Sequence, residues 1–379
     1  MALSRRKFIA AGASSTAALA VQTAAAQTGP ALKRKTPGAG KLFRIGVLTC
    51  HPAYHHMSNI WGPLINCTPI GNSGFVPTRM TGMELTHMWD RDPKRVESFC
   101  STFGTKPVER YDGMVGLVDG VILSDVRNMD YFPQLAAPYL KAGIPVLFNR
   151  PFVSNLGNAK KIVDMSKKYG TPFLAASSWE YCREVYAMRR KVEEWGADTI
   201  RAATAYNSSS EINHDLHGVW LILAMIGGGV ESVSVIRSIK SIYEDGSDAW
   251  TIAFKQRGKN PPFTVTLHNT SDHDSNGWVK VIFEKGTFEQ NLWHTTGGDS
   301  DPRMQFYFIP PLLEFQRVIE RGVMSQSHEQ VLEKSAVFLA GFKSLLKLDS
   351  KPARIAELDD DFIVPSDPNP IKYPDGFFG

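Results

Sequence analysis

The sequence predicts an α/β protein in which a parallel sheet covered by helices precedes an α+β domain with a mainly antiparallel sheet. Two observations predict this class. Between residues 42 and 176, short strands that are apolar on both faces alternate with segments of helical spacing. After residue 177, longer strands with alternating polar and apolar residues mostly follow one another directly. We therefore expect a first domain at 42–176 and a second at 177–379, including a C-terminal tail.

In the first domain, the apolar runs of β type predict five strands, at 43–48, 84–88, 120–123, 146–148 and 173–176. The segments between them that have helical spacing predict three helices, at 93–103, 131–142 and 158–169. Because long crossovers join these strands, the strands should run parallel.

In the second domain, an amphipathic helix is expected at 183–195 and a strongly periodic closing helix at 329–346. The alternating segments predict six strands, at 200–206, 230–239, 249–255, 264–268, 278–284 and 286–290. The last thirty residues are rich in Pro and Asp, and we expect them to lie along the surface.

The N-terminus has the pattern of a twin-arginine export signal. Residues 4–9, SRRKFI, have the required order, residues 10–21 are weakly apolar, and Ala24, Ala25 and Ala26 suit a signal peptidase. An accidental basic start on an Ala-rich helix is the alternative. The signal interpretation predicts a periplasmic or otherwise extracytoplasmic protein that crosses the membrane already folded. Residues 1–26 are too short and too polar for a stable membrane span, and the Pro- and Gly-containing residues 27–41 should form a linker.

Composition excludes function driven by bulk charge. Without its first 26 residues the chain has 39 basic and 38 acidic residues, so binding to nucleic acid through a basic surface is not expected. Hydrophobic residues make up 43% of the chain, enough for a substantial core. The four cysteines lack the spacing of a metal site and are expected to be mostly buried thiols.

Several local strings together resemble the Gfo/Idh/MocA family of oxidoreductases. They include 118–123 (VDGVIL), 140–151 (LKAGIPVLFNRP), 90–93 (DRDP), Arg183, and His217 followed ten residues later by Gly227. The resemblance implies a Rossmann-like first domain, NAD or NADP as cofactor, and a sugar, cyclitol or glycoside as substrate. It also implies a homo-oligomer that forms through the sheet of the second domain.

The nucleotide-binding loop departs from the family. No glycine follows the first strand until Gly62, and the bulky residues 49–56 (TCHPAYHH) fill the loop where a pyrophosphate needs room. The positions that the resemblance implies for cofactor binding are Gly46, His51, Asp90, Ser124 and Asn149. Asp90, at the end of the second strand, suits either a ribose hydroxyl or the cap of a solvent-facing helix.

The Glu-Lys-Pro turn of the family is Asn149-Arg150-Pro151 in this chain. Arginine keeps its charge at any physiological pH, so Arg150 can orient or neutralise an oxyanion but makes a poor base. A structural arginine that bridges carboxylates or carbonyls at the turn is the alternative.

A second group of side chains that can transfer protons lies at 211–217, EINHDLH. The family has an aspartate four residues before its catalytic histidine, and here Asn213 stands before His217. We expect His217 as acid or base, with Arg150, Asn213 and Asp215 as the other catalytic residues. Trp179, Arg183 and His214 are expected to contact the substrate. The start of a solvated helix is the alternative interpretation of this segment.

His51, His55, His56 and His87 should lie near the carboxyl ends of the first two strands. With Asp90 they could hold a divalent metal, but there is no Cys partner and no established spacing. Surface or ligand-facing histidines are the favoured interpretation, and no metal ligand is assigned.

Two functions follow from these residues. The first is an exported, nicotinamide-dependent oxidoreductase that acts on a carbohydrate-like molecule. The alternative is a carbohydrate-binding protein or a non-redox enzyme, such as a lyase or hydrolase with or without a metal, on a fold that has lost its dinucleotide site. The missing glycines and Arg150 favour the alternative, whereas export in folded form, Asp90 and His217 favour the oxidoreductase.

Overall fold

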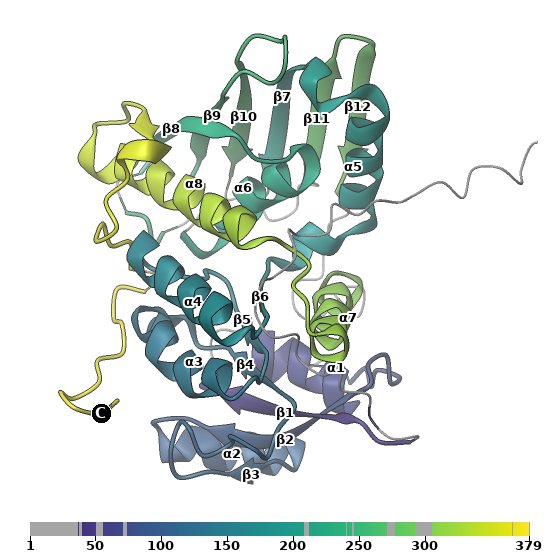
Figure 1. Ribbon diagram of the computed structural model, residues 1–379, viewed down its shortest axis with the longest axis vertical. Coiled ribbons are helices and arrows are strands. Elements are labelled where there is room, and N and C mark those ends of the chain that lie inside the picture. Colours follow the sequence, from purple (N-terminus) through teal and green to yellow (C-terminus); the bar gives the residue numbers. More distant parts are fainter. Residues whose placement is uncertain are drawn as a thin grey trace, which may run out of the picture.

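The computed structural model describes residues 37, 40–50, 56–70, 74–207, 212–239, 241–244, 246–270, 277–292, 305–365 and 367–378. These residues form two packed parts, each built on one β-sheet (Figure 1). The predicted export signal at 1–26 lies outside the described residues.

The first sheet has six parallel strands in the order β3-β2-β1-β4-β5-β6. They are β1 (Phe43–Leu48), β2 (Met83–Trp89), β3 (Lys106–Pro107), β4 (Gly120–Leu123), β5 (Val146–Phe148) and β6 (Phe173–Ala175). The order reverses between β1 and β4, which opens a crevice at the carboxyl ends of these strands. The predicted Rossmann-like parallel sheet is confirmed.

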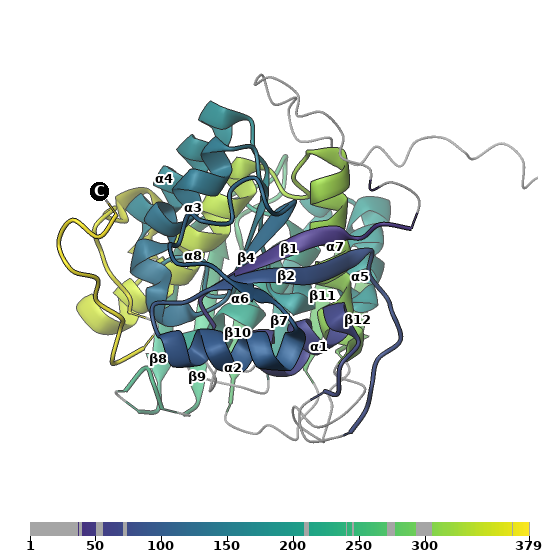
Figure 2. The same cartoon turned by 90° about the horizontal axis from the view of Figure 1, so that it is seen from below.

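Helices cover both faces of this sheet. They are η2 (His56–Trp61), α1 (Gly62–Asn66), α2 (Pro93–Phe103), η3 (Val126–Tyr131), α3 (Phe132–Lys141) and α4 (Leu156–Tyr169). Figure 2 shows α1 and α2 on one side of the strands and α3 and α4 on the other. Asp92 caps α2 by accepting a hydrogen bond from the Lys94 N–H, and Gly104 ends the helix with a φ of 67°.

Helix α7 (Gln305–Arg321) returns from the second half of the chain to the first sheet. A side chain at Gly120, which opens β4, would meet the Phe315 and Ile319 side chains of α7 at 3.0 and 2.7 Å. Glycine therefore allows the helix to approach the sheet closely. Helix α7 is absent from the sequence prediction because its two adjacent prolines, Pro310 and Pro311, are typical of helix breaks.

The second sheet has seven strands in the order β12-β11-β7-β10-β9-β8-β13. They are β7 (Ile200–Asn207), β8 (Val230–Arg237), β9 (Asp248–Phe254), β10 (Phe263–Asn269), β11 (Trp278–Phe283), β12 (Gly286–Asn291) and β13 (Ala353–Arg354). All neighbours are antiparallel except β10 and β7, so the prediction of a mainly antiparallel sheet is confirmed.

Helices α5 (Arg183–Trp195), α6 (Ile212–Ile226) and α8 (His328–Lys347) gather on one side of the second sheet (Figure 1). Short helical turns, η4 (Ser178–Tyr181), η5 (Ala197–Thr199) and η8 (Ile355–Glu357), complete the connections of this part. Helix α6 is absent from the prediction because apolar residues surround most of it, which hides the helical period; Trp220, Leu221 and Ile222 are all buried.

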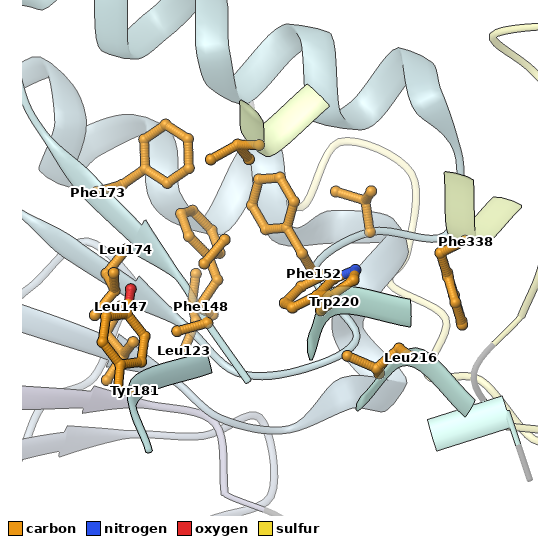
Figure 3. Close-up of a cluster of buried hydrophobic side chains, with 14 of the residues drawn as sticks. Leu123, Leu147, Phe148, Phe152, Phe173, Leu174, Tyr181, Leu216, Trp220 and Phe338 are labelled. Atoms are coloured by element: carbon orange, nitrogen blue, oxygen red, sulfur yellow. The ribbon is translucent and has the colours of Figure 1, made fainter. Parts of the chain in front are cut away.

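One hydrophobic core joins the two parts (Figure 3). Phe148 and Phe152 have ring centroids 5.1 Å apart, and Phe173 lies 5.7 Å from each of them. The same cluster includes Trp220 from α6 and Phe338 from α8. Because burying one such side chain contributes roughly 1.5–3 kcal/mol, this core holds the crevice between the two parts in a defined shape.

The C-terminal segment leaves β13 and runs back along the first part, past α4 toward α3 (Figure 1). The Val364 N–H donates to the Ser154 carbonyl at 2.8 Å, and the Asp360 carbonyl accepts from the Gly157 N–H at 2.9 Å. The segment therefore lies along the surface, as expected, but its aromatic end is packed into the first part.

The four cysteines are free thiols. Cys50 and Cys182 are buried, whereas Cys67 and Cys100 are half-buried. Burial raises the pKa of the Cys50 thiol to about 12, so it is protonated at neutral pH.

Candidate active site

The candidate site lies where the carboxyl ends of β5 and β6 face helices α6 and α7. Asn149 and Arg150 directly follow β5, and Ser177 comes two residues after β6. His217 is on α6, and the turn η4 that follows Ser177 packs against both α6 and α7. The site is thus formed at the boundary between the two parts, on the side of the reversal point where β4, β5 and β6 end.

Arg150 and Asn149 hold His56 in one orientation. The Arg150 Nη2 atom lies 3.3 Å from His56 Nε2, and His56 Nδ1 lies 2.9 Å from Asn149 Oδ1. Arginine can only donate, so Nε2 accepts and Nδ1 carries the proton that is donated to Asn149. The Asn149 amide donates to the Ser124 carbonyl at 2.9 Å, which fixes its own orientation. A neutral His56 therefore bridges the turn after β5 and the segment after β1.

Ser177 binds His217 across the boundary. Its hydroxyl oxygen lies 2.5 Å from His217 Nδ1 and accepts a hydrogen bond from the Trp179 N–H at 3.2 Å. With Nδ1 engaged by Ser177, Nε2 is the nitrogen of His217 that is left for a substrate. Ser177 is itself fixed, because its N–H donates to Glu180 in a capping box.

Burial and neighbouring positive charge keep His217 neutral. The residue is 5% exposed. Burial lowers its pKa well below the ordinary value of 6.5, and the charge of Arg150 and the neighbouring His214 and His56 lower it further. His217, Arg150, His56 and His214 are therefore brought together, and the first two are the pair expected from the sequence.

Aromatic rings form one side of this group. The Trp179 ring is stacked 5.8 Å from His217 and 6.1 Å from Tyr307, measured between ring centroids. Trp179 and His214, two of the three expected substrate residues, thus lie beside His217. Arg183, the third, has a side chain that is 88% exposed and pairs with Glu184 at 2.7 Å.

A buried ion pair supports Ser177 from beneath. Lys334 of α8 lies 3.1 and 3.2 Å from the two carboxylate oxygens of Glu180 and donates to the Ala175 carbonyl at 2.5 Å. Both side chains are at most 4% exposed. Because removal of one partner would leave the other buried and unpaired, this pair fixes η4 relative to α8.

The structure places Asp215 away from this group, contrary to the expectation that it acts beside His217. Its carboxylate lies 3.2 Å from Arg237, which also binds Asp248 at 2.6 Å, and all three side chains are at most 1% exposed. Residues two apart on a helix point to nearly opposite sides, so Asp215 faces the second sheet while His217 faces the crevice. Asn213 is in α6, and its side chain lies outside the described part of the chain.

The cofactor side differs from a glycine-rich loop. Thr49 has a φ of 60°, a conformation that favours glycine, and its hydroxyl accepts a hydrogen bond from the Asp125 N–H at 3.3 Å. Gly46, expected to contact the cofactor, instead lies inside β1 against Met114, whose sulfur would be 2.6 Å from an added Cβ. Its role is packing, not phosphate binding. His51 and His55 lie outside the described residues.

Asp90 is 6% exposed, so it is not the cap of a solvent-facing helix, which is Asp92. Its two oxygens accept hydrogen bonds from the N–H groups of Cys50 at 3.0 Å and Asp92 at 2.8 Å. The pKa of Asp90 is raised above its ordinary value, because the effect of burial outweighs that of these two bonds, which act in the opposite direction. Little of the carboxylate is accessible to a ribose in this arrangement.

Ser124, another expected cofactor residue, is buried after β4, and the Asp125 carboxylate beside it is fully covered. Asp125 caps η3 and binds Arg127 at 2.6 Å and Arg95 at 3.4 Å. The residues present thus fit a ligand on the Arg150 side of the crevice. On the Asp90 side, the present arrangement does not fit the second half of a dinucleotide.

The histidines form no metal centre in the described part of the chain, where no group of three His, Cys, Asp or Glu residues could hold an ion. His56 is a partner of Arg150. His87 is within β2, where its Nδ1 lies 3.0 Å from the Thr86 hydroxyl, and burial lowers its pKa.

The sequence did not single out two residues beside His217, Ser177 and Tyr307. Ser177 begins the string SSWE, whose serine and glutamate at the spacing of a capping box could have drawn attention to it. Tyr307 is in α7, which the sequence did not predict, so no local signal pointed to it.

Comparisons with known proteins agree with the fold. The sequence model of an oxidoreductase family with an NAD-binding Rossmann fold, GFO_IDH_MocA, matches residues 70–177. This match confirms the resemblance inferred from the sequence and, at the level of the family, the cofactor class. No curated protein matches the chain.

Three solved structures illustrate the similarity in fold. The scyllo-inositol dehydrogenase of Lactobacillus casei, solved with NAD(H) and scyllo-inositol, has 13% identity and a TM-score of 0.63, over 84% of this chain and all of that one. GenD2 of gentamicin A biosynthesis, in complex with NAD, has 14% identity and a TM-score of 0.63, over 85% and 99%. An oxidoreductase of Thermotoga maritima has 13% identity and a TM-score of 0.61, over 84% and 100%. At this identity the likeness establishes the fold.

None of the helices in the described residues has both the length and the apolar character needed to cross a membrane.

Proposed function

We propose that this protein, whose residues 70–177 match the model of the Gfo/Idh/MocA oxidoreductase family, interconverts an alcohol and a carbonyl on a sugar, cyclitol or glycoside. The observation that supports this most is the meeting of His217, Arg150 and His56 at the carboxyl ends of β5 and β6. Of the solved relatives, the one from Lactobacillus casei binds scyllo-inositol, a ring of the proposed class.

The nicotinamide of NAD or NADP, when bound, supplies acceptance or donation of a hydride. Asn149 and Arg150 are the residues of this chain that would lie toward it, since they follow β5 on the Arg150 side of the crevice. The protein's own task is to hold the reacting hydroxyl and to move its proton.

His217 is the proposed acid or base. Its Nε2 faces away from Ser177 and can accept the proton of a substrate hydroxyl or donate one to a carbonyl oxygen. A pKa well below 6.5 means that the imidazole is neutral at neutral pH, as a base requires.

Arg150 is proposed to stabilise negative charge on the reacting oxygen. It cannot give up a proton at physiological pH, so proton transfer falls to His217. The hydrogen bond to His56 directs the guanidinium across the crevice and stabilises one rotamer, which preorganises the positive charge for an oxyanion. The structural-arginine alternative does not explain why this guanidinium faces two histidines.

Trp179 and Tyr307 are proposed to receive the substrate ring. The C–H face of a sugar or cyclitol packs well on an aromatic face, and polar groups such as His214 at the edge would bind its hydroxyls. The half-buried Trp179 gives such a surface beside the proposed acid or base.

Export by the twin-arginine route and delivery to the periplasm remain part of the proposal, supported by residues 4–9. Replacement of Arg5 and Arg6 by lysine should leave full-length precursor in the cytoplasm.

A homo-oligomer is also proposed, through the face of the second sheet opposite α5, α6 and α8, where Thr251 and Ile236 are exposed. Sedimentation of the purified protein tests it.

One experiment tests the function. Freshly purified protein is denatured and the released nucleotide is identified by mass spectrometry; intact protein is then incubated with NAD or NADP and a panel of cyclitols and sugars. Reduced nicotinamide should form with at least one of them. If no nucleotide is released or bound and no substrate is oxidised, the non-redox alternative replaces this proposal; the comparisons do not favour that alternative.

A further inference from the structure

The C-terminal segment ends in an aromatic cluster that covers the carboxyl ends of β2 and β4. Its members from the segment are Tyr373, Phe377 and Phe378, which lie 4.8 to 5.0 Å from one another between ring centroids. They pack on rings of the first part: Phe377 on Trp89 at 6.2 Å and Phe378 on Tyr131 at 5.6 Å. Three rings from the last seven residues are thus held against the Rossmann domain.

Tyr373 is the centre of this cluster and is 8% exposed. The Arg91 guanidinium lies over the Tyr373 ring, 5.5 Å from its centroid, and the Tyr373 hydroxyl donates to Asn128 Oδ1 at 2.5 Å. Backbone contacts fix the flanking residues, since Arg91 also donates to the Lys372 carbonyl and the Ile371 N–H donates to the Arg127 carbonyl at 3.2 Å.

The Tyr373 ring contacts residues that follow β2 and β4, at the edge of the sheet where Rossmann proteins hold the adenosine half of a dinucleotide. In Rossmann sheets the acid at the end of the second strand binds the ribose of that half, and Asp90 occupies that place here. Arg91 is the next residue, and Asn128 comes from the turn that follows β4. Burial raises the pKa of Tyr373, and the negative charges of Asp90 and Asp125 raise it further.

The contacts of Tyr373 are also those that would bind an adenine. An arginine stacks on a flat aromatic system, and a side-chain amide meets a polar group at the edge of that system. The phenol of Tyr373 uses both. Its presence, together with the hydrogen bonds that Asp90 accepts from Cys50 and Asp92, explains why the Asp90 side of the crevice does not fit a dinucleotide in this structure.

We propose that the C-terminal segment and the adenosine half of the dinucleotide are alternative occupants of one site, with Tyr373 in the place of adenine. This inference rests on the nicotinamide cofactor of the proposed function. A dinucleotide must displace the segment, so the apparent dissociation constant is raised by the inverse of the fraction of molecules in which the segment is undocked. The segment is therefore a built-in competitor that sets how readily the enzyme takes up and releases its cofactor.

Displacement can be confined to the end of the chain. Val364 is buried and bound to Ser154, and Asp360 pairs with Lys160 at 2.7 Å. The chain therefore stays attached up to that point while the aromatic end leaves. Prolines at 365, 368 and 370 make the connection between Val364 and the aromatic end semi-rigid.

Binding of NAD, AMP and nicotinamide mononucleotide to the full chain, measured by titration calorimetry, tests the inference. Tyr373→Ala should bind NAD and AMP at least about tenfold more tightly than the wild type and nicotinamide mononucleotide equally. Tyr373→Phe keeps the ring and loses only the bond to Asn128, so its gain should be smaller. Ile363→Ala, in the same segment but 52% exposed and outside the cluster, is the control and should match the wild type.

Trypsin gives a second measurement that does not depend on activity. The bond after Lys372 should be protected while Arg91 holds the Lys372 carbonyl, and saturating AMP should accelerate its cleavage in the wild type, observed as loss of residues 373–379 by mass spectrometry. This arm needs no variant, so a folding defect in Tyr373→Ala does not prevent the test.

The outcomes separate the two proposals. Equal NAD affinity in wild type and Tyr373→Ala, or weaker binding in the variant, overturns the competition and leaves the oxidoreductase proposal standing. If neither protein binds NAD, AMP or nicotinamide mononucleotide, the competition and the oxidoreductase proposal both fail. Tighter binding in the variant together with AMP-accelerated cleavage of the wild type supports the competition.

Discussion

His217 Nδ1 lies 2.5 Å from the hydroxyl oxygen of Ser177, and this contact joins α6 of the second part to the end of β6 in the first. A serine hydroxyl can either donate or accept a hydrogen bond. When it accepts, Nδ1 bears the proton of the neutral ring, and Nε2 is free to take a proton from an alcohol. The imidazolium that results keeps its Nδ1–H bond to Ser177 and, in the reverse direction, returns the Nε2 proton to the carbonyl oxygen. When the hydroxyl donates instead, Nε2 of the neutral ring bears the proton and can only donate a hydrogen bond to the substrate, so the first arrangement is the one that supports proton transfer.

Replacement of His217 by alanine should lower turnover by about 10²–10⁴-fold, because proton transfer by a positioned group contributes that much. Substrate affinity should change little. His328→Ala is a matched control, since His328 is also buried and also bonds to a serine, Ser166, at 2.9 Å, but lies away from the crevice. Steady-state kinetics of the two variants measure the effect. Equal losses in both would show that His217 acts through stability alone.

Ser177→Ala should lower kcat by roughly 5–10-fold, the value of one hydrogen bond of about 1–1.5 kcal/mol, with little change in KM. The remaining ring would still titrate but would no longer be held in orientation. Ser166→Ala removes the corresponding partner of His328 and should leave kcat unchanged. A drop in thermal stability of equal size in both variants, without a specific loss of kcat in Ser177→Ala, would contradict the positioning role.

Arg150→Met should raise the pKa of His217 toward 6.5, because the positive charge that opposes protonation is removed. Nuclear magnetic resonance titration of the ring protons measures this directly. The acid limb of kcat/KM for alcohol oxidation should move to higher pH with it. Arg150→Lys keeps the charge, so the pKa of His217 should stay low while the bond to His56 is altered. An unchanged titration in Arg150→Met would place the guanidinium too far from His217 for the proposed role.

Local patterns in the sequence predict most of the fold. The bounds of β1, α2, β4, β5 and α5 agree with the structure because each element has its own clear period or its own end signals, such as Gly104 after α2. The sequence did not predict α1, α6 or α7, and in α6 and α7 the local pattern is misleading. In α7 the two prolines hide an apolar stripe that includes Leu312 and Phe315, and in α6 burial on most sides removes the polar face.

The site could be predicted only where family resemblance covers it. His217 and Arg150 stand in recognisable strings, and the structure brings them together. The contact between Ser177 and His217 joins residues 40 positions apart in the chain, and the contact between Arg91 and Tyr373 joins residues 282 positions apart. A single sequence gives no signal for either contact. Asp215 is the opposite case. It is two residues from His217 in the sequence, but it binds Arg237 on the other side of α6.

Acid should destabilise the protein through its buried neutral histidines. Burial lowers the pKa of His217 well below 6.5 and also lowers that of His328. Above about pH 6.5 these rings are neutral in both states, so their contribution to stability is complete. Below that pH the unfolded chain binds protons at these histidines and the folded chain does not. The free energy of unfolding therefore falls by up to about 1.4 kcal/mol per pH unit for each such histidine.

Thermal unfolding of the wild type, His217→Gln and His328→Gln between about pH 7.5 and 5.5 measures this slope. Asp90, whose pKa burial raises, acts with the opposite sign, but it is present in all three proteins and its effect therefore cancels in their comparison. The melting temperature should fall with pH in the wild type and fall less steeply in each variant, because each has lost one group that protonates only on unfolding. His217→Gln should show the larger reduction in slope, since Arg150 adds its charge to the effect of burial. Three parallel curves would mean that His217 is already accessible to protons in the folded protein, and the neutral base proposed for catalysis would lose its physical basis.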